Sequence, residues 1–399
     1  MIRKEVEEMK KNKNKSHHDQ PLTISSLPEE ILEHILARIS KWNYPNLSLV
    51  SKRFLSLLSS PQIYTTRSNI GTTEPCLYFC LQLSKNQSFD LYTLWMTPSE
   101  TLTNDGDDDI PGDYSLVAVP CYPHPHCVPY DFTSVAVGSE IYLIGAPSKS
   151  PPAVRILDCG SNTWRDGPNM MVARKCAKAV FVDGKIFVMG GYGKLEFMAW
   201  TEVLDIKTQT WSSLPSHGDS ADELSSSEEE LEISMLEVEG KIYAMDDPNN
   251  YAYCDMKKGT LEVVVVETHS SMMWIYAWCV IENVVYGYTD SNICMWYELK
   301  SRKWREVKGS NLELLLGQDT CCLAHGFVLD LVNYGGKLLV LWMTVHVDNA
   351  KQIKRIRCAK MALEKRHGGE DWGKMEWANT LLMVPESFEF LSSCVVVSI

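Results

Sequence analysis

The chain has 399 residues, which exceeds one average domain and favours two domains or one large repeat architecture. Hydrophobic residues make up 45% of it and charged residues 22%, which excludes wholesale disorder. Asp and Glu outnumber Lys and Arg by 51 to 38, for a formal net charge of −13. Because so acidic a surface repels phosphate backbones, we expect no nucleic-acid partner. No run of about 18 apolar residues occurs, so we expect no association with a membrane.

The cysteines and the first residues indicate the compartment. The 13 cysteines are an odd number and include no Cys-x-x-Cys pair, and the charged N-terminus lacks the apolar core of an export signal. Both features favour free, mostly buried thiols in a reducing environment. We therefore expect the protein in the cytoplasm, in the nucleus or in both.

Residues 1–21 are polar and basic, which predicts a disordered tail. Helical patterns begin in the segment that follows. Ser26 and Glu29 have the spacing of a capping box, and Pro28 falls in the first turn. Apolar residues then recur at helical spacing, namely Ile31, Leu32, Ile35, Leu36 and Ile39.

A second short helix is expected from Pro45, and a third apolar run ends at Pro61. We place the boundaries of this helical module at residues 22–66. Three short helices cannot enclose an adequate core alone, so we expect their apolar surface to have a partner.

Residues 74–399 contain short β segments instead of helices. Tight turns followed by apolar strands recur there, at Gly138-Ser139, Asp183-Gly184, Glu239-Gly240, Glu282-Asn283 and Gly335-Gly336. Gly and Asn suit these turns because a two-residue hairpin loop needs positive φ.

A second repeated element is an acidic residue six positions before a tryptophan, as in Asp158 and Trp164, Asp205 and Trp211, and Glu298 and Trp304. We interpret it as an outer hairpin. Trp164 and Trp211 lie 47 residues apart, a length typical of one four-stranded β-propeller blade. The three tryptophans are expected to be structural, because the seam between two blades can bury a large ring.

This spacing, together with Gly190-Gly191, resembles the kelch repeat. Counting hairpins predicts six blades. The count includes Leu83 to Phe89 as an outer hairpin, and a long link over 97–130 follows it. We expect residues 76–94 and 388–399 to share the closing blade, because pairing the two ends leaves no exposed edge strand.

The helical module carries a more specific pattern. Leu27-Pro28, Ile31-Leu32, Ile35-Leu36, Leu47 and Val50-Ser51-Lys52-Arg53-Phe54 resemble the F-box. An F-box followed by kelch blades resembles the plant F-box/kelch-repeat family over residues 22–399. The resemblance implies a mainly β fold, in which a small all-α F-box module precedes a six-bladed kelch-type β-propeller.

The resemblance also implies a function, that of substrate receptor in a Skp–cullin–F-box (SCF) E3 ubiquitin ligase. The F-box would dock a Skp-type adaptor, and through it the cullin and RING subunits. The propeller would hold an unknown protein target for ubiquitination and degradation. No chemistry by this chain and no cofactor or metal are implied.

The resemblance assigns adaptor binding to nine residues of the module: Leu27, Pro28, Ile31, Leu32, Ile35, Leu36, Leu47, Val50 and Phe54. An unpartnered apolar helical face independently favours docking, although the helices could instead cap the propeller. For the target we expect the propeller face with the longer loops, where Met170, Met171, Arg174 and Trp200 have interface character. Blade packing is the alternative role for Arg174 and Trp200.

Other chemistry finds little support. Cys121-x-x-His124-x-His126-Cys127 offers four zinc-ligand types, but so close together, and among prolines, they rarely wrap one ion. No Gly-x-Ser-x-Gly motif and no phosphate-binding glycine loop occur. Two alternatives stay open: a non-catalytic kelch scaffold that acts without ubiquitin transfer, and a propeller enzyme.

Overall fold

The structure is a computed structural model in which the chain divides into two compact units, Met1–Thr72 and Thr73–Ile399. The described residues are 24–83, 88–96, 114–119, 132–145, 153–174, 177–190, 201–214, 234–247, 250–255, 260–265, 275–289, 293–298, 303–309, 327–348, 351–366, 370–385 and 388–399. The tail predicted over 1–21 lies outside them.

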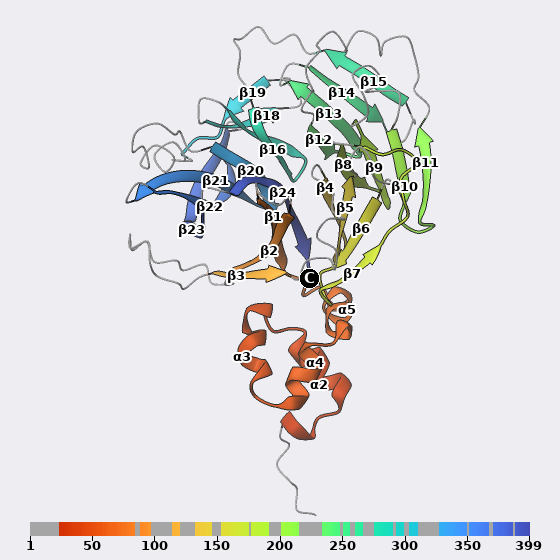
Figure 1. The fold of residues 1–399 in the computed structure, drawn as a ribbon, viewed down its shortest axis with the longest axis vertical. Helices are drawn as coiled ribbons and strands as arrows, with labels where there is room; N and C mark the ends of the chain where they lie inside the picture. Colours follow the sequence, from red (N-terminus) through yellow and green to blue (C-terminus); the bar gives the residue numbers. More distant parts are fainter. Residues whose placement is uncertain are drawn as a thin grey trace, which may run out of the picture. The chain divides into compact units, whose positions relative to one another are not determined.

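The first unit is helical (Figure 1). Its elements are the 3₁₀ turns η2 (Ile24–Ser26) and η3 (Lys41–Asn43) and the helices α2 (Glu29–Leu36), α3 (Tyr44–Ser48), α4 (Lys52–Leu58) and α5 (Pro61–Ile70). The expected capping box does not form, because Ser26 lies in η2 and α2 begins after Pro28 without a side-chain cap. None of the described helices is long and apolar enough to cross a membrane.

Pro61 begins a helix where the sequence pattern predicted an end. It occupies the first turn of α5, where its missing N–H removes no hydrogen bond, and the Ser60 side chain accepts from Gln62 N. The helix ends at Gly71, which adopts a left-handed φ of 68°.

The core of the helical unit is built around a buried arginine on α5. Arg67 donates hydrogen bonds to Ala37 O at 3.1 Å and Ile39 O at 2.7 Å, beyond the end of α2. A cation is favoured there because the last carbonyls of a helix carry partial negative charge. The apolar residues buried around it are Leu32, Leu36, Ala37, Tyr44, Leu57, Leu58 and Ile63.

The described residues of the second unit form six antiparallel four-stranded sheets (Figure 1). The first four sheets are β24-β1-β2-β3 (Phe388–Ser398, Pro75–Leu83, Ser88–Met96, Tyr114–Val119), β4-β5-β6-β7 (Thr133–Val137, Glu140–Gly145, Ala153–Asp158, Thr163–Asp166), β8-β9-β10-β11 (Lys178–Val182, Lys185–Met189, Thr201–Asp205, Thr210–Leu214) and β12-β13-β14-β15 (Ser234–Val238, Lys241–Asp247, Asn250–Asp255, Thr260–Val265). The other two are β16-β17-β18-β19 (Ile275–Ile281, Val284–Thr289, Cys294–Glu298, Lys303–Glu306) and β20-β21-β22-β23 (Phe327–Tyr334, Lys337–Asp348, Lys351–Arg366, Glu370–Pro385).

The tight turns lie where the sequence predicted them. Both central residues have positive φ at Asp183-Gly184, Glu239-Gly240, Glu282-Asn283 and Gly335-Gly336, and Gly138 has a φ of 60°. This backbone matches the twist of the two strands that each turn joins.

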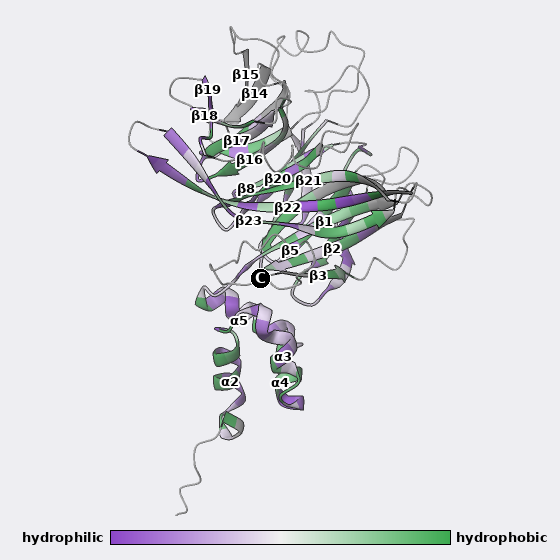
Figure 2. Cartoon of the chain, turned by 90° about the vertical axis from the view of Figure 1, so that its left-hand side faces the viewer, coloured by the Kyte–Doolittle hydropathy of each residue, from purple (hydrophilic) through white to green (hydrophobic). Residues whose placement is uncertain are grey.

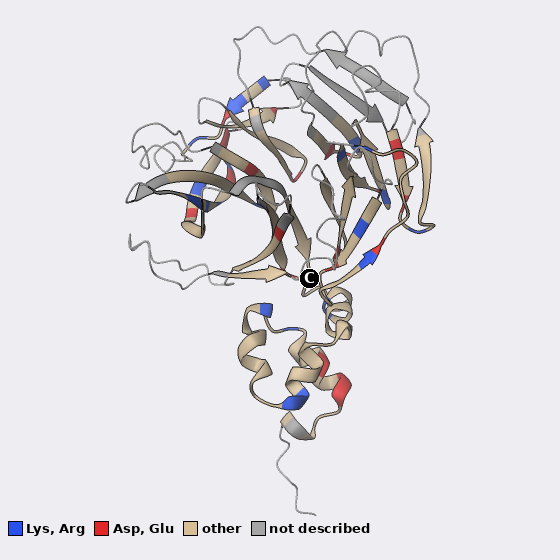
Figure 3. Ribbon diagram, viewed as in Figure 1, with Lys and Arg blue, Asp and Glu red and all other residues tan. Residues whose placement is uncertain are grey.

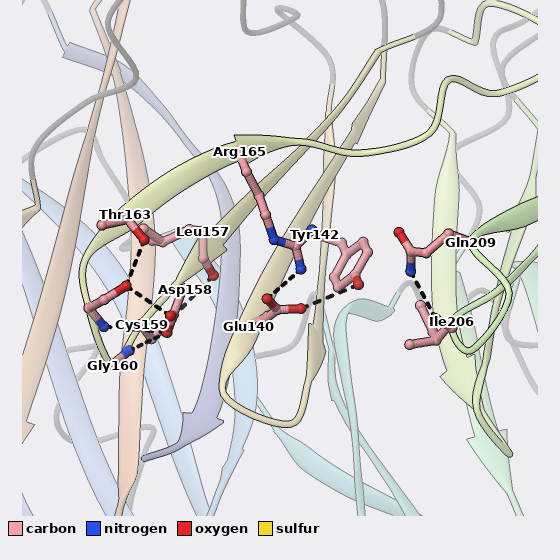
Figure 4. Close-up of polar contacts among 11 residues, drawn as sticks. Glu140, Tyr142, Leu157, Asp158, Cys159, Gly160, Thr163, Arg165, Ile206 and Gln209 are labelled. Carbon is pink, nitrogen blue, oxygen red and sulfur yellow. Dashed lines mark hydrogen bonds and ion pairs between the residues drawn. The ribbon is translucent and has the colours of Figure 1, made fainter. Parts of the chain in front are cut away.

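The outer hairpins also follow the prediction, since Trp164, Trp211 and Trp304 lie opposite the residue before each acidic position. The acidic residue shapes the turn in two of them. The Asp158 carboxylate accepts from Gly160 N at 2.9 Å (Figure 4). The Asp205 carboxylate accepts from Thr208 N, also at 2.9 Å. Such Asx turns reverse the chain locally, which explains the fixed spacing.

Trp211 and Trp304 are partly buried and pack between neighbouring sheets. Trp211 Nε1 donates to Pro168 O at 2.9 Å, which joins β11 to the segment that follows β7. The Trp304 ring lies 5.0 Å from Tyr297 in a cluster that includes Val238 of the sheet next to it. The rings at 211 and 304 therefore occupy seams, as expected.

The sheets contact one another in a cycle. The first strand of each sheet touches that of the next, in the order β4, β8, β12, β16, β20, β24 and back to β4. The two ends of the unit meet in one sheet, where β24 pairs antiparallel with β1 from Pro75 opposite Ser398 to Leu83 opposite Phe388. The prediction of a mainly β propeller after a small helical module is confirmed.

One detail of the shared sheet corrects the sequence analysis. The hairpin around Leu83 and Phe89 is the middle one of its sheet, and β3, inside the expected link, forms the fourth strand. The reason is that β24 is a single strand of 11 residues in the innermost position, which moves β1 and β2 outward by one place.

Deleting Phe388–Ile399 should prevent the second unit from folding. The deletion leaves one edge of β1 unpaired, although β2 still pairs with its other edge. It also removes Val397 and Ile399, both buried, so the loss of stability should exceed that caused by removing a surface strand. Circular dichroism melting and light scattering measure the outcome, with Ser398→Ala, an exposed position on β24, as the control. A truncated chain that melts like the full one would contradict this role of β24.

Candidate interaction surfaces

The helical unit exposes several large aliphatic side chains. Ile31 and Ile35 on α2 are 49% and 43% exposed, and Val50 is 65% exposed. Figure 2 shows hydrophobic residues on α2 and α3, and Figure 3 shows the acidic residues of α2. Three further aliphatic residues that the sequence analysis did not single out are also exposed: Ile24, Leu49 and Leu55. Leu49 and Val50 could have been found as an apolar pair just beyond a helix end.

Two of the nine predicted adaptor-binding residues do not lie on this surface. Leu32 and Leu36 are each 1% exposed and belong to the core of the unit. Positions 31 and 35 form one row along the helix, and positions 32 and 36 form the next row, about 100° around the axis. The sequence shows both rows as one stripe, and only the packing distinguishes them.

Of the other predicted adaptor-binding residues, most have an exposure between that of Ile31 and that of Leu32. Leu27, Leu47 and Phe54 are partly buried, and Pro28 is exposed. Arg53 Nη2 donates to Leu27 O at 2.7 Å, which ties the segment before α2 to α4. This contact gives the arginine of the F-box pattern a positioning role.

The predicted target-binding residues on the propeller differ from one another in exposure. Met170 is buried in a core cluster and Arg174 is 1% exposed, whereas Met171 is exposed. Trp200 lies outside the described residues, as do most of the long loops of the expected face. Met170 and Arg174 are therefore corrected from surface contacts to packing residues.

A buried ion pair explains the position of Arg174. Its Nε donates to Glu202 Oε1 at 3.0 Å and its Nη1 donates to Gly190 O at 2.7 Å, while Glu202 is also 1% exposed. The other carboxylate oxygen of Glu202 accepts from Met171 N at 2.6 Å. The pair thus anchors the 168–174 segment to β9 and β10, and pairing is what makes burial of both charges tolerable.

One partly buried carboxyl, that of Asp330, lies on an inner strand that contacts β24. The Asp330 carboxylate on β20 accepts from Leu331 N at 2.9 Å. Desolvation raises the pKa of Asp330 to about 7, although hydrogen bonds from Leu331 and Cys394 and the charge of Lys178 act in the opposite direction.

Neither a metal site nor a reactive thiol is present among the described residues. The described residues contain no group of three or more His, Cys, Asp or Glu placed to hold a metal ion. None of the cysteines at 76, 80, 159, 279, 294, 358 and 394 forms a disulfide, and all of these but Cys394 are buried. Burial raises the pKa of the Cys358 thiol well above its usual range. The Cys121–Cys127 motif lies outside the described residues.

Comparison with known proteins decides the family. An F-box domain model matches residues 24–66, and a model described as FKB95, Kelch-repeats domain, matches residues 91–382. The chain belongs to the F-box/kelch-repeat family.

Its similar relatives are plant proteins. It is 48% identical to the Arabidopsis thaliana F-box/kelch-repeat protein At5g39560, over 99% of this chain and 97% of that one. It is 40% identical to the Arabidopsis F-box/kelch-repeat protein At4g19870, over 94% and 93% of the two chains. The F-box match covers the helical unit with the exposed aliphatic residues.

Arg174→Met should destabilise the propeller by about 3–5 kcal/mol, because it leaves the Glu202 carboxylate buried without its counter-ion. Denaturant unfolding measures the loss. The double variant Arg174→Met with Glu202→Leu should recover most of it, since no lone charge then stays buried. Equal destabilisation in the single and double variants would be inconsistent with this explanation.

Asp330 should make the stability depend on pH. An unfolded Asp loses its proton near pH 4, whereas the folded one keeps it up to about pH 7. The contribution of Asp330 to the free energy of unfolding should therefore be fully present below about pH 4 and be lost, by up to about 4 kcal/mol, as the pH rises to 7. Urea unfolding at about pH 5 and about pH 7.5 should show a smaller fall in Asp330→Asn. The exposed Asp183→Asn serves as the control, and an unchanged fall in Asp330→Asn would refute the assignment.

Proposed function

We propose that this protein is the substrate-recognition subunit of an SCF-type E3 ubiquitin ligase. The helical F-box unit docks a Skp-type adaptor, and through it the cullin and RING subunits. The propeller binds a target protein for ubiquitination and degradation. The chain supplies binding surfaces and no catalytic group, and it acts in the cytoplasm, the nucleus or both.

The observation that carries the proposal is the set of exposed aliphatic side chains on the F-box unit. Ile31, Ile35 and Val50 stand exposed although the unit already has its own closed core. An isolated exposed aliphatic residue is ordinary, but several on so small a unit favour a partner that covers them. Their burial on an adaptor would contribute roughly 1.5–3 kcal/mol for each side chain.

For the propeller we propose six blades in one closed ring. The cycle of contacts between six sheets and the pairing of β24 with β1 support this count. A ring of this kind offers a rigid frame whose loops can differ freely between relatives, which suits a receptor for one particular protein.

Ile31→Asp should abolish adaptor binding and leave the fold intact, because the side chain is exposed in the free chain but would be buried as a charge in the complex. Co-purification with a Skp-type adaptor measures binding. Gln62→Asp, an equal change of charge at an exposed position of α5, should bind normally. Undiminished binding by Ile31→Asp would overturn the assignment.

The same pull-down separates this function from that of a scaffold without ubiquitin transfer. A ligase subunit should bring down both the adaptor and a cullin. A protein that captures neither, while its circular dichroism spectrum stays that of the folded chain, would be a scaffold.

A further inference from the structure

An exposed arginine, Arg38, follows the C-terminal end of α2. Its backbone N–H donates to Ile35 O at 3.2 Å, and Ala37 keeps helical backbone angles, so the turn of α2 continues to this residue. Ile31 lies seven positions earlier, which is within about 20° of two full turns of an α-helix. Arg38 therefore continues the exposed aliphatic row of Ile31 and Ile35 at its C-terminal end.

The guanidinium of Arg38 makes a hydrogen bond but no ion pair within the part of the chain that the structure describes. Its Nη1 donates to His34 O at 2.7 Å, an exposed contact with the last turn of its own helix. This bond uses one of the five N–H donors of an arginine. A carbonyl oxygen carries no full charge, so the positive charge of Arg38 has water, and no carboxylate, as its counterpart.

The acidic residues of α2 lie too far from Arg38, or on another side of the helix, to neutralise it. The Glu33 carboxylate accepts from Thr66 of α5. Glu29 and Glu30 lie in the first turn, where carboxylates suit the positive end of a helix. Glu30 is eight residues before Arg38, which is about 12 Å along the helix axis. One end of the aliphatic row is therefore cationic.

This position constrains any partner that covers the row. A protein surface that buries Ile31 and Ile35 also takes the neighbouring Arg38 out of water. Burial of a guanidinium without a counter-ion opposes binding, whereas a carboxylate can accept two parallel hydrogen bonds from it. A carboxylate at this place would therefore favour the correct partner, and a partner without one would be rejected.

We propose that Arg38 pairs with a carboxylate of the Skp-type adaptor and so helps to select that partner. The adaptor surface that fits is an apolar patch, which covers Ile31 and Ile35, with an Asp or Glu side chain at one end. The ion pair also fixes the direction in which this surface lies along α2. This inference rests on the proposed function, because it names the chemistry by which the F-box unit recognises the adaptor.

The test uses the full chain and a purified Skp-type adaptor from Arabidopsis thaliana, the organism of the similar relatives. Isothermal titration calorimetry measures the dissociation constant. Arg38→Gln should weaken binding about tenfold, and Arg38→Glu about a hundredfold, because the reversal brings two like charges together. Gln62→Asp makes the same change of net charge as Arg38→Gln at an exposed position of α5, and it should bind within about twofold of the original chain.

A charge swap distinguishes direct pairing from a weakened end of α2, since Arg38 also holds His34 O. Each Asp and Glu of the adaptor is changed singly to Lys. One of these adaptor variants should bind Arg38→Glu about tenfold more tightly than the unchanged adaptor does, because the pair is restored with its charges exchanged. A damaged helix end could not be repaired from the adaptor. Circular dichroism melting checks that each variant is folded.

Three results would overturn the proposal: undiminished binding by Arg38→Glu, equal losses in Arg38→Gln and Gln62→Asp, or no adaptor variant that restores the binding of Arg38→Glu. Ile31→Asp is titrated alongside. If Ile31→Asp loses the adaptor while Arg38→Glu keeps it, the ion pair alone is refuted. If the original chain does not bind the adaptor, the ligase function is refuted as well.

Discussion

The pairing of β24 with β1 is the contact on which the propeller depends. It joins residues more than 300 positions apart, and it continues past the strands, where Glu74 and Ile399 exchange backbone hydrogen bonds of 2.8 and 3.0 Å. A four-stranded sheet alone has little independent stability and presents open edges. Each sheet gains its stability by burying its faces against two neighbours, so the last seam must close before the others are complete. The cost is slow folding, because the closing contact is far from local in sequence.

The seams hold polar groups as well as apolar ones, and these specify the geometry. Arg174 and Glu202 are both buried, and their hydrogen bonds reach three separate segments of chain. Between two other sheets, Tyr286 donates to Asp371 at 2.8 Å, and burial together with this contact raises the pKa of the Tyr286 hydroxyl. A buried polar pair tolerates little displacement, because a shifted partner leaves a desolvated group unsatisfied. Apolar packing sets how strongly the sheets adhere, and the pairs set their register.

The F-box unit is small, yet it folds around its own core and still leaves aliphatic side chains exposed. Arg67 holds the end of α2 through backbone carbonyls, and the closed core requires only one row of the α2 side chains. The row of Ile31 and Ile35 is then free for a partner.

The sequence by itself determined what depends on neighbouring residues. Tight turns such as Asp183-Gly184 need positive φ, and outer turns such as that at Asp158 need a side-chain acceptor, so both are visible within a few letters. Their period predicted the propeller, and the F-box pattern predicted the family. Only the tertiary structure decided which row of α2 lies inside, that the β1–β2 hairpin is the middle one of its sheet, and that Arg174 is buried. Burial is decided by residues distant in the chain, here β24 and Glu202, and a local pattern contains no information about them.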